Sequence, residues 1–544
     1  MPITDLLERN SKLYGEETAL VEANPEELET KFVSWEEYEL IQPTQSEPYR
    51  REISWGVFDE KANRCANMLM NYGIKKGQKV AHLMMNCLDW LPIYFGILKT
   101  GAIAVPLNFR YTAEEISYCL DKAEADVLFF GPEFVDRMQS LLPGISENRL
   151  LIYVGEQRVS FAQDYHIATA NCSSRAPRVL VEDDDDGAIY FSSGTTGFPK
   201  AILLKHAALT HAAKQEAMHH ETTKDDVFLC IPPLYHTGAK MHWFGSLYTG
   251  GKAVLLKGVN PRAIFEAVSR EGCSIVWLLV PWCQDVLTAL DRGEIKISDY
   301  NLEQLRLMHI GAQPVPPSLI KHWKEYFPHH KYDTNYGLSE STGPGCVHLG
   351  VSNIHKVGAI GKPGFGWECK IVDEAGEIVP KGETGELCVK GPGLMVCYFG
   401  DEEATSACLK DGWLHTGDMA KCDEDGFYFL VDRKKDVIIS GGENLYPVQI
   451  EEFLAANPKI HDVAVIGVPD KRLGEIAAAV IQIKEGEQCS EEEINEFCSA
   501  LPKYKRPRKI IFAPVPRNPT GKIEKPKLRE TYCGVRLVEA QSMG

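Results

Sequence analysis

A run of glycine and hydroxyl residues closed by a lysine occupies residues 190–200, which read YFSSGTTGFPK. Glycines in such a loop let backbone amides approach phosphate oxygens, the hydroxyls donate to those oxygens, and Lys200 supplies positive charge. The run therefore predicts a loop that binds a nucleoside triphosphate. Its spacing excludes a P-loop, because only two residues separate Gly194 from Gly197 and two more precede Lys200.

Four further segments combine glycines, hydroxyls and charged residues. They read YGLSE at residues 336–340, WLHTGD at 413–418, DRKKD at 432–436 and NPTGK at 518–522. With the loop at 190–200, their order and spacing resemble the adenylate-forming superfamily, which contains acyl-CoA synthetases, peptide-synthetase adenylation domains and beetle luciferases. The resemblance covers nearly the whole chain. In one departure, Ala201 stands where the family usually has a glycine after the loop lysine.

The resemblance implies activation of a carboxylic acid in two steps. The carboxylate attacks the α-phosphorus of ATP to give an acyl-adenylate, and a thiol then displaces AMP. Because the first step brings a carboxylate against a polyphosphate, a metal ion and cations must offset the charge. By resemblance Glu340 holds Mg²⁺ and Lys522 bridges the carboxylate and the α-phosphate. The candidate catalytic residues are Thr195, His236, Glu340 and Lys522.

The nucleotide site of the family maps onto residues between 192 and 522. Asp418 and Arg433 are expected to hold the ribose hydroxyls, a task suited to a carboxylate acceptor beside a fixed donor fork. A flat backbone and a tyrosine ring around positions 311 and 336 can sandwich the adenine. The full candidate set is Ser192, Ser193, Gly194, Thr195, Thr196, Lys200, Gly311, Ala312, Gln313, Asn335, Tyr336, Gly337, Ser339, Asp418, Arg433 and Lys522.

The second step must exclude water and admit a thiol, which one static site does poorly. The family rotates its C-terminal domain about a hinge two residues past the ribose arginine, here Lys435. In one pose the domain presents Lys522. In the other it presents a narrow thiol tunnel, for which the candidate residues are Gly441, Gly442 and Glu443.

The acyl pocket is also assigned by resemblance. Its candidate residues are Tyr235, His236, Thr237, Gly238, Ile310, Gly311, Leu338 and Gly343, with Trp243, Trp277 and Trp282 as candidate walls. The small residues leave room for a ring or a long chain. Lys240 and His242 could place positive charge near a second carboxylate, although such residues more often face solvent. The sequence leaves open whether the acid is fatty, aromatic, dicarboxylic or steroidal.

Three alternatives share these motifs. A carrier-protein phosphopantetheine could accept the acyl group, but the insertion typical of such ligases is not evident near residues 352–364, so CoA is favoured. Luciferase-type oxygenation is rare in the family, and the chain ends in QSMG without a peroxisomal signal. A non-catalytic acyl- or nucleotide-binding regulator is disfavoured because Glu340 and Lys522 are both present.

Composition narrows the class further. The formal net charge of −18 argues against a nucleic-acid partner, because a phosphate-backbone binder normally shows a basic face. The 16 cysteines lack metal-ligand spacing, which favours reduced thiols in a cytosol. Neither a signal peptide nor an uninterrupted apolar stretch of membrane-spanning length is evident, so a cytoplasmic protein without an integral membrane segment is expected. A homodimer is one option, and the sequence leaves the oligomeric state open.

The chain of 544 residues exceeds one hydrophobic core, so two or more domains are expected. Short apolar runs at 79–85, 102–107, 125–130 and 274–280, with an expected helix at 90–100, predict an α/β fold with mostly parallel sheets. Turn-rich residues 365–389 predict a small β-rich subdomain. We expect a large N-terminal domain at 1–432, a hinge at 433–435 and a small, mobile α+β C-terminal domain at 436–544.

Overall fold

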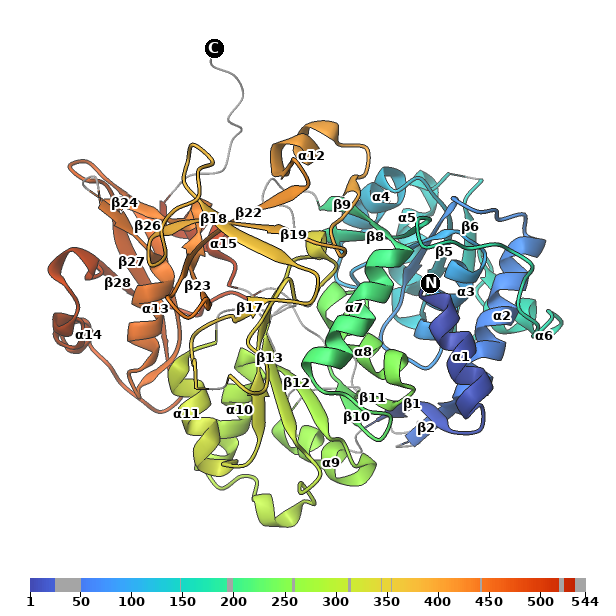
Figure 1. The fold of residues 1–544 in the computed structure, drawn as a ribbon, viewed down its shortest axis with the longest axis horizontal. Helices are drawn as coiled ribbons and strands as arrows, with labels where there is room; N and C mark the ends of the chain where they lie inside the picture. Colours follow the sequence, from blue (N-terminus) through green and yellow to red (C-terminus); the bar gives the residue numbers. More distant parts are fainter. Residues whose placement is uncertain are drawn as a thin grey trace.

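A computed structural model of the chain describes residues 1–24, 50–146, 148–192, 199–256, 260–311, 315–343, 345–353, 355–440, 443–517 and 523–533. Within these ranges the strands form two large sheets, a small three-stranded sheet and two five-stranded sheets. The two large sheets and their helices make up most of the N-terminal part, and the last sheet forms a separate body at the opposite end of the molecule (Figure 1). The mixed α/β architecture is therefore confirmed.

The first large sheet has eight strands in the order β20-β9-β8-β4-β3-β5-β6-β7. Strands β3 to β6 pair in parallel, whereas β8 and β9 form the antiparallel pair that flanks residues 193–198. The bounds are β3 (Lys79–Leu83), β4 (Ile103–Pro106), β5 (Ala125–Phe130), β6 (Leu150–Tyr153), β7 (Gln163–Asp164), β8 (Asp186–Ser192), β9 (Lys200–Lys205) and β20 (Cys397–Tyr398), with helices α2 (Trp55–Asn71), α3 (Trp90–Lys99), α4 (Ala113–Lys122), α5 (Val135–Leu141) and α6 (Tyr165–Ala170).

The second large sheet has seven strands in the order β14-β13-β12-β10-β11-β1-β2, all parallel except the edge pair β1 and β2. The strand bounds are β1 (Thr18–Ala23), β2 (Arg50–Ser54), β10 (Val227–Cys230), β11 (Lys252–Leu256), β12 (Ile275–Leu279), β13 (Leu307–Gly311) and β14 (Lys331–Asp333). The helices of this half are α1 (Thr4–Tyr14), α7 (His206–His219), α8 (Thr237–Thr249), α9 (Pro261–Glu271), α10 (Val280–Asp291) and α11 (Pro317–Tyr326).

Short antiparallel strands follow, as the turn-rich sequence predicts. One sheet contains β15 (Asn335–Tyr336), β16 (Val347–His348) and β17 (Lys362–Pro363). The next contains β18 (Glu368–Val372), β19 (Thr384–Lys390), β21 (Leu409–Lys410), β22 (Trp413–Cys422) and β23 (Tyr428–Arg433), with helix α12 (Glu402–Cys408) beside it. Short 3₁₀ turns lie at η1 (Pro132–Phe134), η2 (Leu142–Gly144), η3 (Ile297–Asp299), η4 (Ser339–Ser341), η5 (Lys434–Asp436), η6 (Cys498–Ala500) and η7 (Lys503–Lys505).

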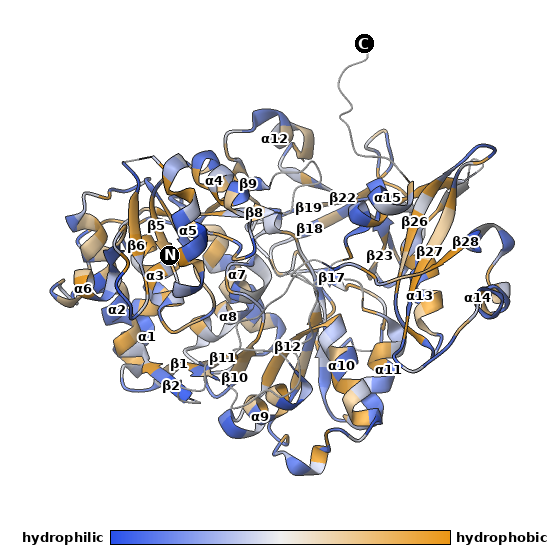
Figure 2. Ribbon diagram, turned by 180° about the vertical axis from the view of Figure 1, so that it is seen from behind, coloured by the Kyte–Doolittle hydropathy of each residue, from blue (hydrophilic) through white to orange (hydrophobic). Residues whose placement is uncertain are grey.

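The C-terminal body has hydrophobic clusters of its own, which begin at Ile438, whereas the large N-terminal cluster ends near Leu430. The bounds of its elements are β24 (Ile438–Ser440), β25 (Glu443–Leu445), β26 (Ile460–Asp470), β27 (Gly474–Ile483), β28 (Lys509–Phe512), α13 (Pro447–Ala455), α14 (Glu491–Phe497) and α15 (Lys525–Cys533). Figure 2 shows hydrophobic β26 and β27 beside the more polar α14 and α15. The strands are more hydrophobic than the helices because the apolar sheet is buried under short amphipathic helices.

The apolar runs gave most of the element positions correctly. The strand predicted at 125–130 is β5, and the helix predicted at 90–100 is α3, after which Gly101 adopts a positive φ of 72° as a helix C-terminus requires. The strand predicted at 274–280 is one residue shorter at each end, because Val280 begins α10. Proline can occupy the first turn of a helix, and Pro281 does so here.

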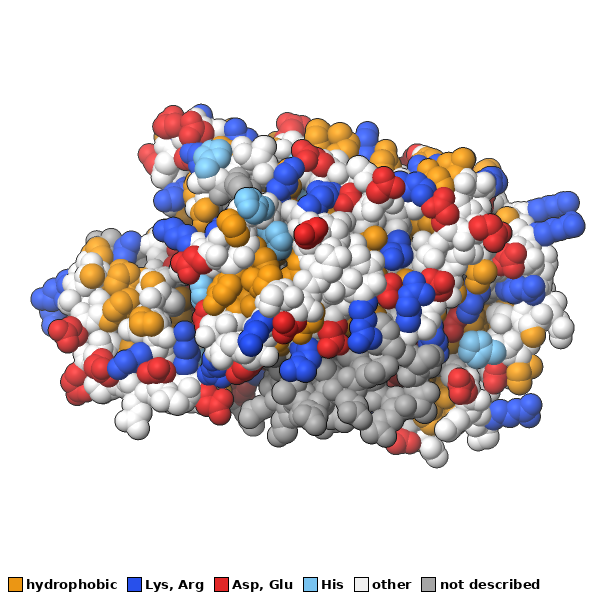
Figure 3. All heavy atoms as spheres, turned by 90° about the horizontal axis from the view of Figure 1, so that it is seen from below, with side chains coloured by type: hydrophobic (Ala, Val, Ile, Leu, Met, Phe, Trp, Pro, Cys, Tyr) orange, Lys and Arg blue, Asp and Glu red, His pale blue; other side chains and the backbone are white. Residues whose placement is uncertain are grey.

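The surface carries charges of both signs. In Figure 3, basic and acidic side chains are interspersed over the face shown and do not gather into one basic field. Within the described ranges, every helix is too short or too polar to cross a bilayer.

Lys240 of α8 is an unusual core residue. Its side chain is fully buried, and its Nζ has no hydrogen-bond partner among the described residues. The amine lies 4.0 Å from the ring centre of Tyr94 and 3.9 Å from that of Tyr190. Burial lowers the pKa of Lys240 well below its ordinary value. The unfolded chain therefore binds a proton that the folded chain lacks, and this lysine makes stability rise with pH.

We predict that Lys240→Met raises the free energy of unfolding by about 1–3 kcal/mol near pH 7, because it removes a buried polar group without a partner. The gain should shrink as the pH approaches the ordinary pKa of lysine, where the unfolded chain also loses the proton. Thermal melting between pH 6 and pH 9 measures both effects.

Lys99→Met is the matched control, because Lys99 is also buried but its Nζ contacts Asp59 and Asn63, each at 2.8 Å. That substitution should destabilise the protein, since it leaves a carboxylate without its cation. A lower melting temperature for Lys240→Met at every pH would show instead that the aromatic rings stabilise a charged amine.

Candidate active-site cleft

A cleft of about 1490 Å³ lies where the N-terminal part meets the C-terminal body. Its walls include the start of α8, helix α10, the segment 332–343 around β15, and the junction of β22 with β23. Residues 448–463 and 523–527 of the C-terminal body line the opposite side. Described residues of four of the five motif segments, and Arg517 and Ile523 beside the fifth, therefore converge on one cavity, although they are up to hundreds of residues apart in the chain.

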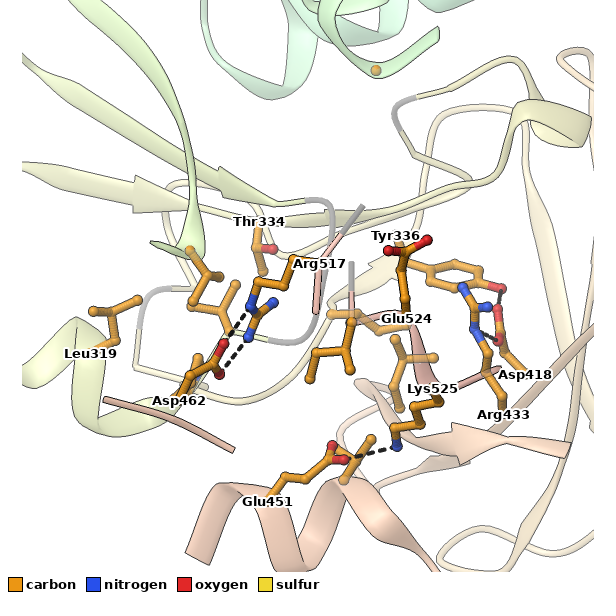
Figure 4. Close-up of a pocket in the computed structure, with 18 of the residues that line it drawn as sticks. Leu319, Thr334, Tyr336, Asp418, Arg433, Glu451, Asp462, Arg517, Glu524 and Lys525 are labelled. Atoms are coloured by element: carbon orange, nitrogen blue, oxygen red, sulfur yellow. Dashed lines mark hydrogen bonds and ion pairs between the residues drawn. The ribbon is translucent and has the colours of Figure 1, made fainter. Parts of the chain in front are cut away.

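A carboxylate held by two donors forms one end of this cleft. Strand pairing places Asp418 of β22 directly opposite Arg433 of β23. The Tyr336 hydroxyl donates to Asp418 Oδ2 at 2.6 Å, and Arg433 Nε lies 3.7 Å from Asp418 Oδ1. Figure 4 shows the three side chains converging from different strands. Burial, with the nearby Asp418 charge, raises the pKa of Tyr336 well above its ordinary value, so this hydroxyl keeps its proton.

A second carboxylate is linked to the strands that flank residues 193–198. Ser192 ends β8 and pairs with Lys200 at the start of β9. Lys200 Nζ lies 4.6 Å from the centre of the Tyr398 ring, and the Tyr398 hydroxyl donates to Glu340 Oε1 at 2.8 Å. Tyr398 therefore joins the loop lysine to the candidate metal carboxylate. No sequence motif points to Tyr398, because its segment carries none of the glycine or charge patterns that mark the motifs.

The backbone around β15 is packed too closely for larger side chains. A Cβ atom on Gly337 would overlap the Gly343 carbonyl oxygen. Asn335, Tyr336, Gly337 and Gly343 all line the cleft. Ser339 lies in η4, and its Oγ is 3.1 Å from Thr237 Oγ1, which ties this turn to the start of α8. Glycine at 337 is therefore a packing requirement of the wall.

The candidate acyl wall begins at α8. His236 caps this helix, because its Nδ1 accepts from the Gly238 amide at 3.2 Å. Tyr235, Thr237, Gly238 and Leu338 line the cleft as expected. Ile310 does not line it, since it is fully buried in β13, and the expectation for this residue was wrong. Gly311 lies behind the wall, where an added Cβ would be 3.3 Å from Trp277 Nε1.

Trp277 and His242 supply the aromatic part of this wall. Their rings stack at 4.4 Å with an interplanar angle of 9°, and His242 Nδ1 donates to the Gly238 carbonyl oxygen at 2.6 Å. Burial lowers the pKa of His242 to about 3, so the ring is neutral. Lys240 is enclosed in the core, and the other two candidate tryptophans, Trp243 and Trp282, are also core residues. Lys240 and His242 therefore neither face solvent, which was the favoured alternative, nor place a positive charge at this wall.

A buried polar cluster lies behind the same wall. It consists of Glu216 in α7, His220 at the end of α7, His309 in β13 and Asp333 in β14. His220 Nδ1 is 2.7 Å from Glu216 Oε1, and His220 Nε2 is 2.9 Å from Asp333 Oδ2. Burial opposes a charge on His220, but the two carboxylates outweigh it and raise the pKa of His220 to about 10. No sequence motif pointed to this cluster, because its members come from three separate elements.

Two ion pairs of the C-terminal body flank residues 518–522. Arg517 pairs with Asp462 at 2.6 Å on one side, and Lys525 pairs with Glu451 at 2.9 Å on the other (Figure 4). All four residues line the cleft. Lys435 is exposed in η5, directly after β23, and also lines it.

Several candidates fall outside the described residues, namely Ser193, Gly194, Thr195, Thr196, Ala312, Gln313, Gly441, Gly442 and Lys522. Glu443 is described only as part of β25, without its side chain.

The fold and the cleft define a two-part α/β protein with a carboxylate-rich cleft between its parts. Residues 36–399 match the family model described as AMP-binding enzyme, and residues 449–522 match the model of the C-terminal domain of AMP-binding enzymes. The first match alone spans more than half of the chain. The chain belongs to the AMP-binding enzyme family.

Similar proteins carry several different substrate names. The chain is 33% identical over 487 residues to a long-chain-fatty-acid–CoA ligase, FadD13, of Mycobacterium tuberculosis, with 88% of this chain and 93% of the relative covered. It is 32% identical over 484 residues to a feruloyl-CoA synthase of Amycolatopsis, with 88% and 94% covered. A crystal structure of the anthranilate CoA ligase AuaEII with anthranoyl-AMP superposes with a TM-score of 0.87 at 26% identity, covering 98% of this chain and 97% of that chain.

We predict that Gly337→Ala destabilises the protein by about 1–3 kcal/mol or more, because the new methyl group forces the Gly343 backbone to move. Thermal melting measures the loss. Gly144→Ala is the control, since a Cβ there meets nothing within 4 Å. Equal melting temperatures for the two variants would contradict the close packing of this wall.

Proposed function

We propose that this chain is an ATP-dependent acyl-CoA synthetase that converts a carboxylic acid to its acyl-adenylate and then to its CoA thioester, with release of pyrophosphate and AMP. The observation that carries the proposal is one cleft lined by Asp418, Tyr336, Arg433 and Glu340, the last of which is joined to Lys200 through Tyr398. Membership of the AMP-binding enzyme family and the CoA-ligase names of its relatives support it.

In this proposal each end of the cleft binds one part of ATP. Asp418 accepts hydrogen bonds from the ribose hydroxyls, and the Arg433 fork fixes the orientation of its carboxylate. The Tyr336 ring and the backbone from 311 to 313 enclose the adenine. Residues 192–200 hold the phosphates, with Lys200 as their cation. Lys522, which lies in sequence between the ion-paired residues Arg517 and Lys525, bridges the acid and the α-phosphate.

Glu340 fits the proposed Mg²⁺ site. It lines the cleft, and the Tyr398 hydroxyl donates a hydrogen bond to its Oε1. This bond fixes the orientation of the carboxylate and therefore also the direction of its second oxygen. Mg²⁺ is commonly bound by one or two carboxylates together with substrate phosphates. When bound, the ion would neutralise negative charge that repels the incoming carboxylate.

The thioester step is proposed to follow rotation about Lys435. Two hydrogen bonds span this proposed hinge: Asp432 Oδ2 accepts from the Val448 amide at 2.9 Å at the start of α13, and the Arg433 carbonyl oxygen accepts from the Val437 amide at 3.2 Å. A rotation at 435 separates these bonded groups and can bring residues 441–443 to the cleft as a thiol tunnel. The basic stretch at 503–509 is a further candidate for the CoA phosphates.

Cytoplasmic localisation and a homodimer stay predictions.

The wall formed by Trp277 and His242 favours an acid whose acyl portion is uncharged there. His242 is neutral, and the carboxylates of Glu216 and Asp333 lie behind it. Neither Lys240, enclosed in the core, nor the neutral His242 offers a cation to a second substrate carboxylate at this wall. Fatty, aromatic and steroidal acids therefore remain the favoured classes.

The test is AMP release by the purified protein with ATP, Mg²⁺ and a panel of short, medium, long, aromatic, dicarboxylic and steroidal acids, each with and without CoA. Release that requires CoA and one class of acid supports the proposal and names the substrate class. Adenylate formation that is indifferent to CoA would favour a carrier-protein acceptor. No turnover with any acid would favour a non-catalytic regulator.

Tyr398→Phe should raise the Mg²⁺ concentration needed for half-maximal adenylate formation by roughly tenfold, because it removes a charged hydrogen bond worth about 1.5–3 kcal/mol. The ring over Lys200 is kept. Tyr428→Phe is the control, since the Tyr428 hydroxyl donates to the Cys369 carbonyl oxygen, away from Glu340. An unchanged Mg²⁺ dependence would exclude Tyr398 as the group that positions Glu340.

Lys522→Ala should slow adenylate formation by about 10²–10³-fold, as expected for loss of a cation that stabilises the transition state. Thioester formation from a supplied acyl-adenylate should change by less than about threefold. Lys471→Ala, an exposed residue of the same body, is the control. Equal loss in both half-reactions would contradict the two-pose scheme.

Lys435→Pro should show the opposite pattern, with adenylation spared and the thiol step blocked, because proline restricts rotation at its own φ and at the preceding residue. Lys435→Ala keeps the backbone free and should support both steps. If Lys435→Pro lowered the two rates equally, the hinge would lie elsewhere.

A further inference from the structure

The buried cluster behind the acyl wall has a geometry of its own. His220, His309 and Asp333 have side chains that are at most 2% exposed, and none of them is among the residues that line the cleft. They come from the end of α7, from β13 and from β14, and the two strands pair in parallel with His309 directly opposite Asp333. Nothing in the proposed reaction uses them, and strand pairing does not account for the third member, His220.

Three side-chain atoms of this cluster form a triangle. His220 Nε2 lies 2.9 Å from Asp333 Oδ2 and 3.0 Å from His309 Nδ1, and His309 Nδ1 lies 3.5 Å from the same Asp333 Oδ2. Ligand atoms bonded about 2.0 Å from one tetrahedral ion lie about 3.3 Å from one another. The three separations bracket that value, so one ion fits the triangle at ordinary ligand distances.

Hydrogen bonding alone satisfies this triangle poorly. If both nitrogens carry protons, two N–H groups converge on one oxygen with the nitrogens only 3.0 Å apart. If His309 Nδ1 carries none, its lone pair faces the Asp333 carboxylate. Either assignment leaves one repulsive contact in a dry interior, where such contacts are strongest. A cation coordinated by a lone pair from each of the three atoms removes this repulsion.

Charge balance leads to the same conclusion. Glu216 and Asp333 are two buried carboxylates, with side chains 2% and 0% exposed. The groups that face them are imidazoles, from His220, His309 and, at 3.8 Å from Glu216, His242. One imidazolium leaves a net negative charge in the core, which is costly. One divalent cation with neutral imidazoles balances both carboxylates.

The surroundings also resemble those of a metal site. A histidine that binds a metal usually donates its other N–H to a carboxylate. His220 has a carboxylate in ion-pair contact on that side, because its Nδ1 lies 2.7 Å from Glu216 Oε1. The second carboxylate oxygen of Asp333 is fixed as well, because Oδ1 accepts a hydrogen bond from the Gly350 amide at 2.8 Å.

We propose that His220, His309 and Asp333 bind one divalent transition-metal ion of the zinc class, as a buried structural site separate from the Mg²⁺ proposed at Glu340. Two imidazole nitrogens and one carboxylate oxygen suit such an ion, whereas Mg²⁺ prefers an all-oxygen shell. His309 and Asp333 lie two residues before Gly311 and Asn335, so the ion joins α7 to the strand ends that carry the adenine wall.

The direct test measures metal in the full-length protein, purified without chelators from zinc-supplemented cells and kept free of ATP. We expect about one zinc ion per chain that persists through desalting, measured by elemental analysis. Protein stripped of metal and titrated with Co²⁺ should develop the visible absorption of a tetrahedral cobalt site. Neither readout depends on catalytic activity, so a failed synthetase assay leaves this test unaffected.

Three variants identify the site. Glu216→Gln should weaken Zn²⁺ binding by about 10–100-fold in competition with a chromophoric chelator, because it removes the carboxylate behind a ligating histidine. His309→Asn should lose stoichiometric binding. His206→Asn is the control, because His206 lies in the same helix, is equally buried, and stands outside the cluster. It should keep the wild-type metal content.

Two outcomes would overturn the proposal. One is folded wild-type protein with only trace metal and no cobalt spectrum. The other is metal that persists at full stoichiometry in folded His309→Asn, which would place the ion on surface histidines. If His309→Asn fails to fold, the affinity of Glu216→Gln for zinc decides, and an unchanged affinity contradicts the site.

Discussion

The pairing of β22 with β23 is the constraint on which the rest of the cleft depends. It sets Asp418 opposite Arg433, within reach of the Tyr336 hydroxyl, and only four residues separate its end from β24, the first strand of the C-terminal body. The residues proposed to hold the ribose are therefore part of the same strand that leads into the hinge. In the proposed scheme, rotation of the C-terminal body would start from the strand that holds the nucleotide, so binding and domain rotation would share one anchor.

Charge is the second constraint, because an acidic protein of net charge −18 is proposed to bring two anions together. The described cleft concentrates cations at particular points: Lys200 against Tyr398, Arg433 beside Asp418, and Arg517 and Lys525 on either side of the segment that holds Lys522. Each is positioned by a partner and so needs little reordering when substrate arrives. At the acyl wall, by contrast, neither Lys240 nor His242 presents a positive charge, since Lys240 is enclosed by aromatic rings and His242 is neutral.

Much of this could be read from the sequence, for identifiable physical reasons. Apolar runs such as 125–130 gave strands because a parallel sheet covered on both faces needs them, and glycine-rich motifs located the cleft because backbone approaches backbone there, as at Gly337. The prediction that Ile310 lines the acyl pocket was wrong, because a strand residue beside a wall glycine can face either side of its sheet. The Ile310 side chain lies in the core. Tyr398 and the Glu216–His220–His309–Asp333 cluster carry no local pattern. Their roles arise only from the packing of distant elements.

If the proposed function is right, this cleft forms a free-standing acyl-adenylate before any thiol arrives. Isotope exchange between pyrophosphate and ATP, measured without CoA, tests it most directly, because exchange requires reversible formation of the adenylate with pyrophosphate as the leaving group. We predict exchange that depends strictly on Mg²⁺ and on the same acid that supports AMP release with CoA. An acid that supports CoA-dependent AMP release but no exchange, under conditions where pyrophosphate can rebind, would contradict the account.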